Sequence, residues 1–254
     1  MRNLQRGIDM NIRDYINQKK RELLSGRITS DAFQSFFIKN AKEFQKLLTY
    51  YECAIMEVEA KFNILNQEFS LSREYSPIET IKSRLKTMDS LMEKVERYKV
   101  PLSVKSIEEN IEDIAGIRVI CGFPEDIYTV ANCFIQQDDV TLIDCKDYIK
   151  KPKPNGYRSL HLIISVPIYL EHEKRDMKVE VQLRTIAMDF WASLEHKLKY
   201  KKELPEELND RLVAELLECA NIGADLDERM QHIRRQLSGI APEVPEISKE
   251  SNKK

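Results

Sequence analysis

Glycine is scarce in this chain, with seven residues among 254. No Gly-x-x-x-x-Gly-Lys-Ser/Thr or Gly-x-Gly-x-x-Gly pattern occurs, so the two common glycine-rich loops that hold nucleotide phosphates are missing. Long apolar runs are missing too, and we expect no membrane span, because a spanning helix needs roughly 18 or more apolar residues. The first residues contain no apolar signal core, and we therefore expect no export.

Cysteine and histidine are few and show no metal-binding pattern. The 5 cysteines form no Cys-x-x-Cys pair, and their odd number predicts free thiols in a reducing cytoplasm. The 4 histidines lack zinc-type spacing. Neither sign of charge dominates, with 40 Lys+Arg against 42 Asp+Glu, which argues against a general nucleic-acid coat protein, since such proteins are strongly basic.

Hydrophobic spacing predicts an α+β fold in which about five strands are packed by helices, with helical extensions at both ends. Ser76-Pro-Ile-Glu79 is typical of a capping box and predicts a short helical turn before a strand over 81–86. The other predicted strands are 116–123, 140–147, 158–168 and 177–184, and the predicted helices are 9–70, 88 to before Pro101, 124–136, 186–201 and 205–238. We divide the chain into an N-terminal helical extension (1–75), a core (76–203), C-terminal helices (204–240) and a disordered tail (241–254).

An acid, an amide and a guanidinium follow one another on one face of the last predicted strand. Apolar residues alternate there with Glu180, Gln182 and Arg184. Because side chains on a strand alternate between its faces, one face is apolar and the other carries these three groups. Taken alone, this row fits a half-buried strand whose outer face meets water.

Three cations form a second row. If 81–86 is extended, Lys82, Arg84 and Lys86 share one face, whereas in a helix Arg84 and Lys86 would lie about 200° apart. Lysines on a strand edge often serve only to prevent edge pairing. Three cations in a row can also hold a polyphosphate.

Two carboxylates could hold a metal ion. Asp113 precedes a predicted strand and could be a simple cap. Together with Glu180 on the neighbouring strand, it would also supply the one or two protein carboxylates that Mg²⁺ usually takes, alongside phosphates and water.

A basic, proline-stiffened loop over 151–156 leads into Tyr157 at the start of a strand. Tyrosine there could reflect strand propensity alone, or it could be a base-stacking platform beside the phosphate contacts of nearby lysines such as Lys153. A lone strand histidine such as His161 is more often structural than catalytic. Together, however, these groups supply what transfer between two nucleotides requires.

From about residue 45 to 235, a series of ordered motifs resembles the small alarmone synthetases, the single-domain members of the RelA/SpoT group. The motifs are Ser83-Arg-Leu-Lys86, Asp113-Ile-Ala-Gly-Ile-Arg118, Asp147-Tyr-Ile-Lys150, Asn155-Gly-Tyr-Arg-Ser-Leu-His161, Glu180-Val-Gln-Leu-Arg-Thr185 and Ala187-Met-Asp-Phe-Trp-Ala-Ser-Leu-Glu-His196. The resemblance implies a mixed five-stranded sheet of the nucleotidyltransferase type. It also implies Mg²⁺-dependent transfer of pyrophosphate from ATP to the 3′-hydroxyl of GDP or GTP, giving (p)ppGpp and AMP, by a cytoplasmic homo-tetramer that needs no nucleic acid for catalysis.

The resemblance also implies roles for single residues. On the ATP side, adenine would lie between Arg84 and Arg118, with Lys86 at the phosphates. Asp113 and Glu180 would hold Mg²⁺, and Glu180 would also orient or deprotonate the 3′-hydroxyl. On the acceptor side, the implied contacts are guanine stacking by Tyr157, guanine-edge recognition by Asp189, and phosphate and ribose binding by Lys153, His161 and Gln182.

Larger relatives carry a hydrolase domain with a His-Asp metal site. The chain contains no His-Asp dipeptide, so we expect synthesis without hydrolysis. The alternatives are a non-catalytic guanine-nucleotide sensor or an RNA-binding regulator on the same fold. The sensor predicts loss of Asp113 or Glu180, although both are present, and the RNA-binding module predicts a basic surface, although the net charge is −2.

Overall fold

The computed structural model describes residues 36, 39–72, 75–199, 206–238 and 247. In chain order its elements are α3 (Ala41–Ser72), β1 (Ile78–Leu85), α4 (Met88–Tyr98), α5 (Val104–Asn110), β2 (Ala115–Cys121), α6 (Pro124–Ile135), β3 (Thr141–Asp147), β4 (Leu160–Tyr169), β5 (Lys174–Thr185), α7 (Ile186–Lys199) and α8 (Glu206–Ser238). Residues 9–35 of the helix predicted over 9–70, and the tail predicted over 241–254 apart from residue 247, lie outside the described residues. The division into domains stays a prediction.

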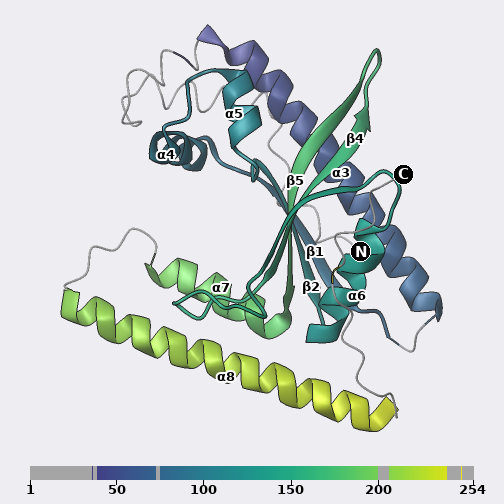
Figure 1. Ribbon diagram of the computed structural model, residues 1–254, viewed down its shortest axis with the longest axis vertical. Coiled ribbons are helices and arrows are strands. Elements are labelled where there is room, and N and C mark those ends of the chain that lie inside the picture. Colours follow the sequence, from purple (N-terminus) through teal and green to yellow (C-terminus); the bar gives the residue numbers. More distant parts are fainter. Residues whose placement is uncertain (1–35, 37–38, 73–74, 200–205, 239–246, 248–254) are drawn as a thin grey trace, which may run out of the picture.

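A five-stranded sheet in the order β1-β2-β5-β4-β3 lies at the centre of the molecule (Figure 1). The central strands β2 and β5 are parallel, and the other neighbouring pairs are antiparallel. The mixed five-stranded sheet and the α+β class are therefore confirmed.

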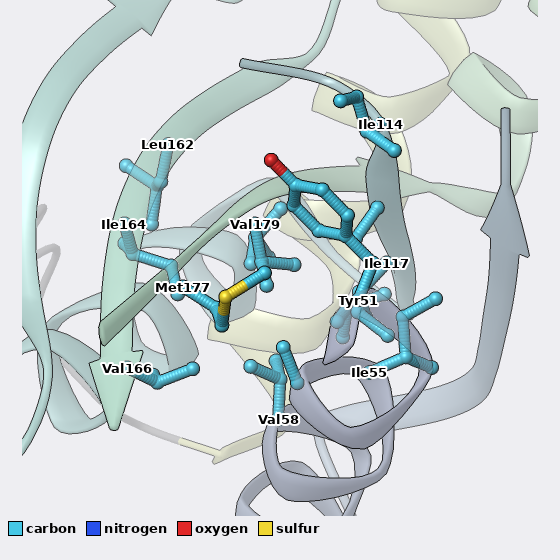
Figure 2. Packing of buried hydrophobic residues seen from close by; sticks show 14 of the residues in the cluster. Tyr51, Ile55, Val58, Ile114, Ile117, Leu162, Ile164, Val166, Met177 and Val179 are labelled. Atoms are coloured by element: carbon cyan, nitrogen blue, oxygen red, sulfur yellow. The ribbon is translucent and has the colours of Figure 1, made fainter. Parts of the chain in front are cut away.

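The hydrophobic core lies on the face of the sheet that α3 and α6 cover (Figure 1). Figure 2 shows Tyr51 and Val58 of α3 pointing toward Val179 of β5 and its neighbours on adjacent strands. Farther along α3, Phe62 stacks on Phe134 of α6 with ring centroids 4.3 Å apart. Each such buried side chain contributes about 1.5–3 kcal/mol. Because this face takes the apolar residues of β5, its polar residues must point to the opposite face.

Helix α7 packs against β5 and β2, and α8 runs across the same end of the strands, where it contacts both α7 and α6 (Figure 1). The 33-residue helix α8 is held to α6 by polar contacts, among them Arg234 with Asp126 (2.8 Å) and Gln231 with Glu125 (2.7 Å). None of the helices in the described part of the chain combines the length and apolarity that a bilayer crossing requires.

The five cysteines are free thiols, as predicted.

The helical turn predicted at residues 76–79 is wrong. Strand β1 already begins at Ile78, which pairs with Cys121, and the carbonyl of Pro77 accepts a hydrogen bond from the Gly122 N–H at 3.3 Å. Pairing with β2 therefore overrides the local capping signal. The short helix α5 was not predicted, because its seven residues hold only two apolar positions, Val104 and Ile107, which are too few to establish a period.

A buried carboxylate ties α8 to the end of β5. Asp227 accepts a hydrogen bond of 2.6 Å from the Thr185 hydroxyl, which in turn accepts from the Met188 N–H in the first turn of α7. Burial raises the pKa of Asp227 from 3.8 to about 6, although the Thr185 bond and the charge of Arg158 lower it in part. A carboxyl whose pKa is higher in the folded state destabilises the fold once it ionises.

We expect Asp227→Asn to remove a pH-dependent loss of stability. The wild type should lose stability relative to the variant as the pH rises from about 4 through 6, with a gap on the order of 1–3 kcal/mol at pH 7.5. Chemical denaturation between pH 4.5 and 7.5 measures the gap. The control is Asp225→Asn on the same helix, where an exposed carboxylate pairs with Arg229. Parallel pH profiles for the wild type and Asp227→Asn would contradict the expectation.

Candidate active site

Strand pairing brings the predicted site residues to the sheet face opposite α3. Arg84 lies opposite Gly116, and Gly116 lies opposite Glu180. His161 lies opposite Gln182 on the other side of β5. Since directly paired residues share a face, these groups from β1, β2, β5 and β4 point to one side of the sheet.

Five side chains on this face form a closed ring of hydrogen bonds, which we call the hydrogen-bonded ring. Glu180 lies 3.2 Å from His161 Nδ1, and His161 Nε2 lies 2.7 Å from the hydroxyl of Tyr157. Arg184 Nη2 donates to that hydroxyl at 2.6 Å and to Gln182 Oε1 at 2.8 Å. Gln182 Nε2 closes the ring by donating to Glu180 at 2.8 Å. Residues that were predicted one by one from their positions along the chain are therefore joined into one hydrogen-bonded network.

The ring keeps Glu180 ionised. Burial raises the pKa of this carboxyl, and so does the nearby charge of Asp113, but the contacts with His161 and Gln182 hold it below its usual value of 4.5. A carboxylate that accepts hydrogen bonds is stabilised in its charged form. At neutral pH, Glu180 is therefore an anion that can accept a further hydrogen bond or bind a cation.

Asp113 lies just before β2 between two lysines. Its Oδ2 accepts from Lys86 Nζ at 2.6 Å, and its Oδ1 lies 2.8 Å from Lys94 Nζ of α4. Burial raises the pKa of Asp113, but the two lysines lower it below 3.8 overall. Lys94 was not predicted from the sequence, because it is one of several polar residues in α4 and nothing in the local pattern connects it to a strand beyond the next helix.

Asp189, in the first turn of α7, binds three cations. Its Oδ1 lies 3.1 Å from Arg118 Nη1 and 3.2 Å from Arg184 Nη1, and its Oδ2 lies 3.4 Å from Lys82 Nζ. Burial lowers the pKa of Arg118, the charge of Arg184 lowers it further, and Asp189 acts against both. Both oxygens of Asp189 are therefore engaged by protein cations, and its predicted contact with a guanine edge stays a prediction.

The loop formed by residues 151–157 packs against α8. Gly156 has a φ of 87°, and a Cβ added there would lie 2.5 Å from the Cβ of Ala220. Arg158 fastens the loop by donating to the carbonyls of Gly156 (3.1 Å) and Ala220 (3.3 Å). Lys153 Nζ lies 4.9 Å from the ring centroid of Tyr157. The glycine thus permits both the turn and the close helix contact that place Tyr157.

The donor atoms of this face suit a hard divalent cation. Within the described residues, no cluster of three or more His, Cys, Asp or Glu side chains could form a complete protein cage for a metal. Asp113 and Glu180 are near enough that the charge of Asp113 raises the pKa of Glu180. A divalent cation would relieve this repulsion, and two carboxylates match the partial ligand set that Mg²⁺ takes when phosphates complete it.

The fold and this face define a nucleotidyltransferase-like class of protein, with cations, two carboxylates and an aromatic ring on one side of a mixed sheet. Residues 83–204 match the region found in RelA/SpoT proteins. The GTP pyrophosphokinase YwaC of Bacillus subtilis is 44% identical over 198 residues, which cover 77% of this chain and 92% of that protein.

Two solved structures with bound nucleotides are also similar. Small alarmone synthetase 1 of Bacillus subtilis bound to its product pppGpp has a TM-score of 0.70 at 33% identity, covering 77% of this chain and 98% of that one. The same enzyme bound to AMPCPP has a TM-score of 0.65 at 32% identity, covering 78% and 100%. The chain therefore belongs to the small alarmone synthetases, the GTP pyrophosphokinases of the RelA/SpoT group, as predicted from its motifs.

Proposed function

We propose that this protein transfers pyrophosphate from ATP to the 3′-hydroxyl of GDP or GTP in the cytoplasm, forming (p)ppGpp and AMP, and that it does not hydrolyse its product. The observation that carries the proposal is the ionised Glu180 in the hydrogen-bonded ring, beside Asp113 and its two lysines. The pppGpp-bound and AMPCPP-bound relatives support the choice of the two nucleotides.

Arg84 and Arg118 would hold the adenine of ATP. Arg84 is exposed and lies opposite Gly116, whereas Arg118 lies two residues farther along the same face of β2. Diagonal neighbours of this kind have their Cα atoms about 7–8 Å apart. Gly116 has no side chain, and the Arg84 side chain lies over it, with Cγ and Nε 3.6 Å from where a Cβ would be. Arginine at this position could turn its planar guanidinium toward a base, on which it stacks well.

Lys86 and Lys94 would bind the ATP phosphates. Both now contact Asp113, so the site already places two cations beside a carboxylate. Arriving phosphates would share the lysines with Asp113 and free a carboxylate oxygen for Mg²⁺. When bound, Mg²⁺ would neutralise charge on the phosphates that are transferred.

Tyr157, Lys153, His161 and Gln182 would bind the acceptor nucleotide. Tyr157 is partly exposed at the edge of the ring, and the long Lys153 side chain beside it can move toward a phosphate. The acceptor's 3′-hydroxyl would donate its hydrogen bond to Glu180. Since the pKa of Glu180 is low, this carboxylate would act mainly by orienting the hydroxyl and stabilising the positive charge that develops on it, and it would take the proton late in the transfer.

Incubation of the protein with ATP, GTP and Mg²⁺, followed by anion-exchange chromatography, tests the proposal. We expect pppGpp and AMP in equal amounts. A non-catalytic sensor or an RNA-binding regulator would form neither. In a second incubation with ppGpp and Mn²⁺, we expect no GDP or pyrophosphate, and their appearance would refute synthesis without hydrolysis.

We expect Arg84→Ala to weaken ATP binding without harming the fold. Arg84 is exposed, so the free energy of unfolding should change by no more than about 0.5 kcal/mol. Loss of a stacked guanidinium should weaken binding of a non-hydrolysable ATP analogue by about 0.5–2 kcal/mol, measured by calorimetry. The control is Lys105→Ala, which removes an exposed cation from α5. Equal affinities for the wild type and both variants would make Arg84 a plain surface charge.

We expect Tyr157→Ala to raise the KM for GTP more than the KM for ATP. Base–aromatic stacking contributes about 1–3 kcal/mol, so the KM for GTP should rise by roughly 5- to 150-fold. Tyr157→Phe is the matched control, since it retains the stacking ring and removes only the hydroxyl. Steady-state kinetics with each substrate varied in turn gives both constants. Equal changes in the two KM values for Tyr157→Ala would contradict the acceptor-side assignment.

A further inference from the structure

Arg184 is a nearly buried arginine, 4% exposed, at the point where the two halves of the site meet. Toward the acceptor side, its Nη2 donates to the Tyr157 hydroxyl and to Gln182. Toward the ATP side, its Nη1 donates to Asp189, whose same oxygen binds Arg118. No role follows for Arg184 from the nucleotide contacts proposed above, although it contacts residues on both sides.

The donors of Arg184 and the carboxylate of Glu180 together determine the direction of the bonds in the hydrogen-bonded ring. A guanidinium only donates, and an ionised carboxylate only accepts. The His161 nitrogen that faces Glu180, Nδ1, therefore carries a proton, and a neutral His161 accepts at Nε2. Arg184 donates to the oxygen of Tyr157, which directs the Tyr157 hydroxyl proton to that Nε2. That Nδ1–H points at Glu180, 3.2 Å away. On the other side of the ring the hydrogen bonds also run from Arg184 to Glu180, since Gln182 accepts from Arg184 and donates to Glu180.

We propose that Arg184 is the positioning residue of this site: it orients Tyr157 and Gln182, and through them presents two N–H donors to Glu180, while its bond to Asp189 holds Arg118 on the ATP side. This role rests on the proposed function in so far as it concerns catalysis. Its effect on His161 is a property of the protein without nucleotides. Arg184 itself acts through its neighbours and needs no contact with either substrate.

Lysine cannot replace Arg184 in this role. The bonds to Asp189 and Tyr157 leave from different nitrogens of one planar fork, Nη1 and Nη2. A lysine ammonium is a single point of charge on a flexible stem and cannot hold both partners in this geometry. Arg184→Lys therefore preserves the buried positive charge beside Asp189 but loses the direction of the bonds.

The first test is the hydrogen bond at His161 Nε2, observed by ¹⁵N NMR without nucleotides at a fixed pH chosen so that the imidazole is neutral. The wild type should show a proton on Nδ1 and an Nε2 signal shifted by the bond from Tyr157, with the signals assigned by a His161→Asn variant. Tyr157→Phe gives the position of the Nε2 signal without that bond. Arg184→Lys should move the Nε2 signal toward this position, because the Tyr157 hydroxyl is free to rotate, and Arg184→Gln is the second variant if Arg184→Lys does not fold.

The second test is kinetic. We expect Arg184→Lys to lower kcat about 100-fold, the cost of misplacing reacting groups by about 1 Å, while both KM values change by only a few-fold. The matched control is Arg175→Lys on the same strand, where the arginine binds Glu108 outside the site at 2.5 and 2.7 Å. That variant should keep the activity of the wild type.

The two tests separate the positioning role from the proposed function. If the wild type makes no pppGpp, the proposed function fails, and the Nε2 signal still reports whether Arg184 directs the ring. An unchanged His161 Nε2 signal in folded Arg184→Lys, or a kcat within a few-fold of the wild type, would overturn the positioning role.

Discussion

A Glu180→Gln protein that folds, binds GTP and makes almost no pppGpp is the first expected result. Glutamine has nearly the same shape but lacks the negative charge. Its amide N–H₂ would also face the donors of His161 or Gln182, which now both point at Glu180. Loss of a group that accepts a proton or orients the nucleophile typically costs about 10²–10⁴-fold in rate. Product formation at saturating ATP, GTP and Mg²⁺ measures the loss, and calorimetry with GTP shows that binding survives.

Glu171→Gln provides the control for charge, because Glu171 is highly exposed in the turn between β4 and β5. It should leave the rate unchanged. If Glu180→Gln were as active as this control, Glu180 would be only part of a polar strand face, and the site assigned around it would have to be abandoned.

The second large effect concerns Asp113. We expect Asp113→Asn to lower the rate by at least about 10²-fold, as for other lost catalytic groups. It should also lower the free energy of unfolding by on the order of 2 kcal/mol, because Lys86 and Lys94 would lose the carboxylate between them and repel each other. Product formation and urea denaturation measure the two losses.

A double change separates these two roles of Asp113. Asp113→Asn combined with Lys94→Met removes the surplus cation, so stability should recover, while activity should stay well below that of Lys94→Met alone. Activity equal to that of Lys94→Met alone would mean that Asp113 serves only to neutralise the lysines. Because the pKa of Asp113 is lowered in the fold, its contribution to stability is present above pH 3.8. The gap between the wild type and Asp113→Asn should therefore be constant from pH 6 to 8 and close in acid.

Much of the fold follows from local patterns. The alternation along β5 predicted both the strand and the face that carries Glu180, since a period of two is enough to separate a core face from a polar one. The prediction failed at Ser76-Pro-Ile-Glu79, where pairing with β2 decides the conformation, and at α5, where two apolar positions leave no period to detect. The first failure arises from pairing with a distant strand, and the second from a helix too short to show a local pattern.

The site was predicted as a set of residue types and not as a network. Motif spacing placed acids, cations and an aromatic ring on neighbouring strands, and the register brings them to one face. Lys94 and the link between Arg184 and Asp189 could not be predicted, because they depend on where α4 and α7 pack against the sheet. The nucleotide contacts of the individual residues stay predictions until the variants are measured.

The parallel pairing of β2 with β5 affects when the protein can become active during its synthesis on the ribosome. Between these strands the chain forms α6, β3 and β4, so the central pair joins segments that are distant in sequence. Closing such a long loop is slow compared with forming a helix such as α3. A nascent chain that has not yet exposed β5 lacks Glu180 and the register that aligns it with Gly116. We therefore expect synthesis of the nucleotide product only once β5 has been added, and in a refolding experiment we expect activity to return later than the helical signal.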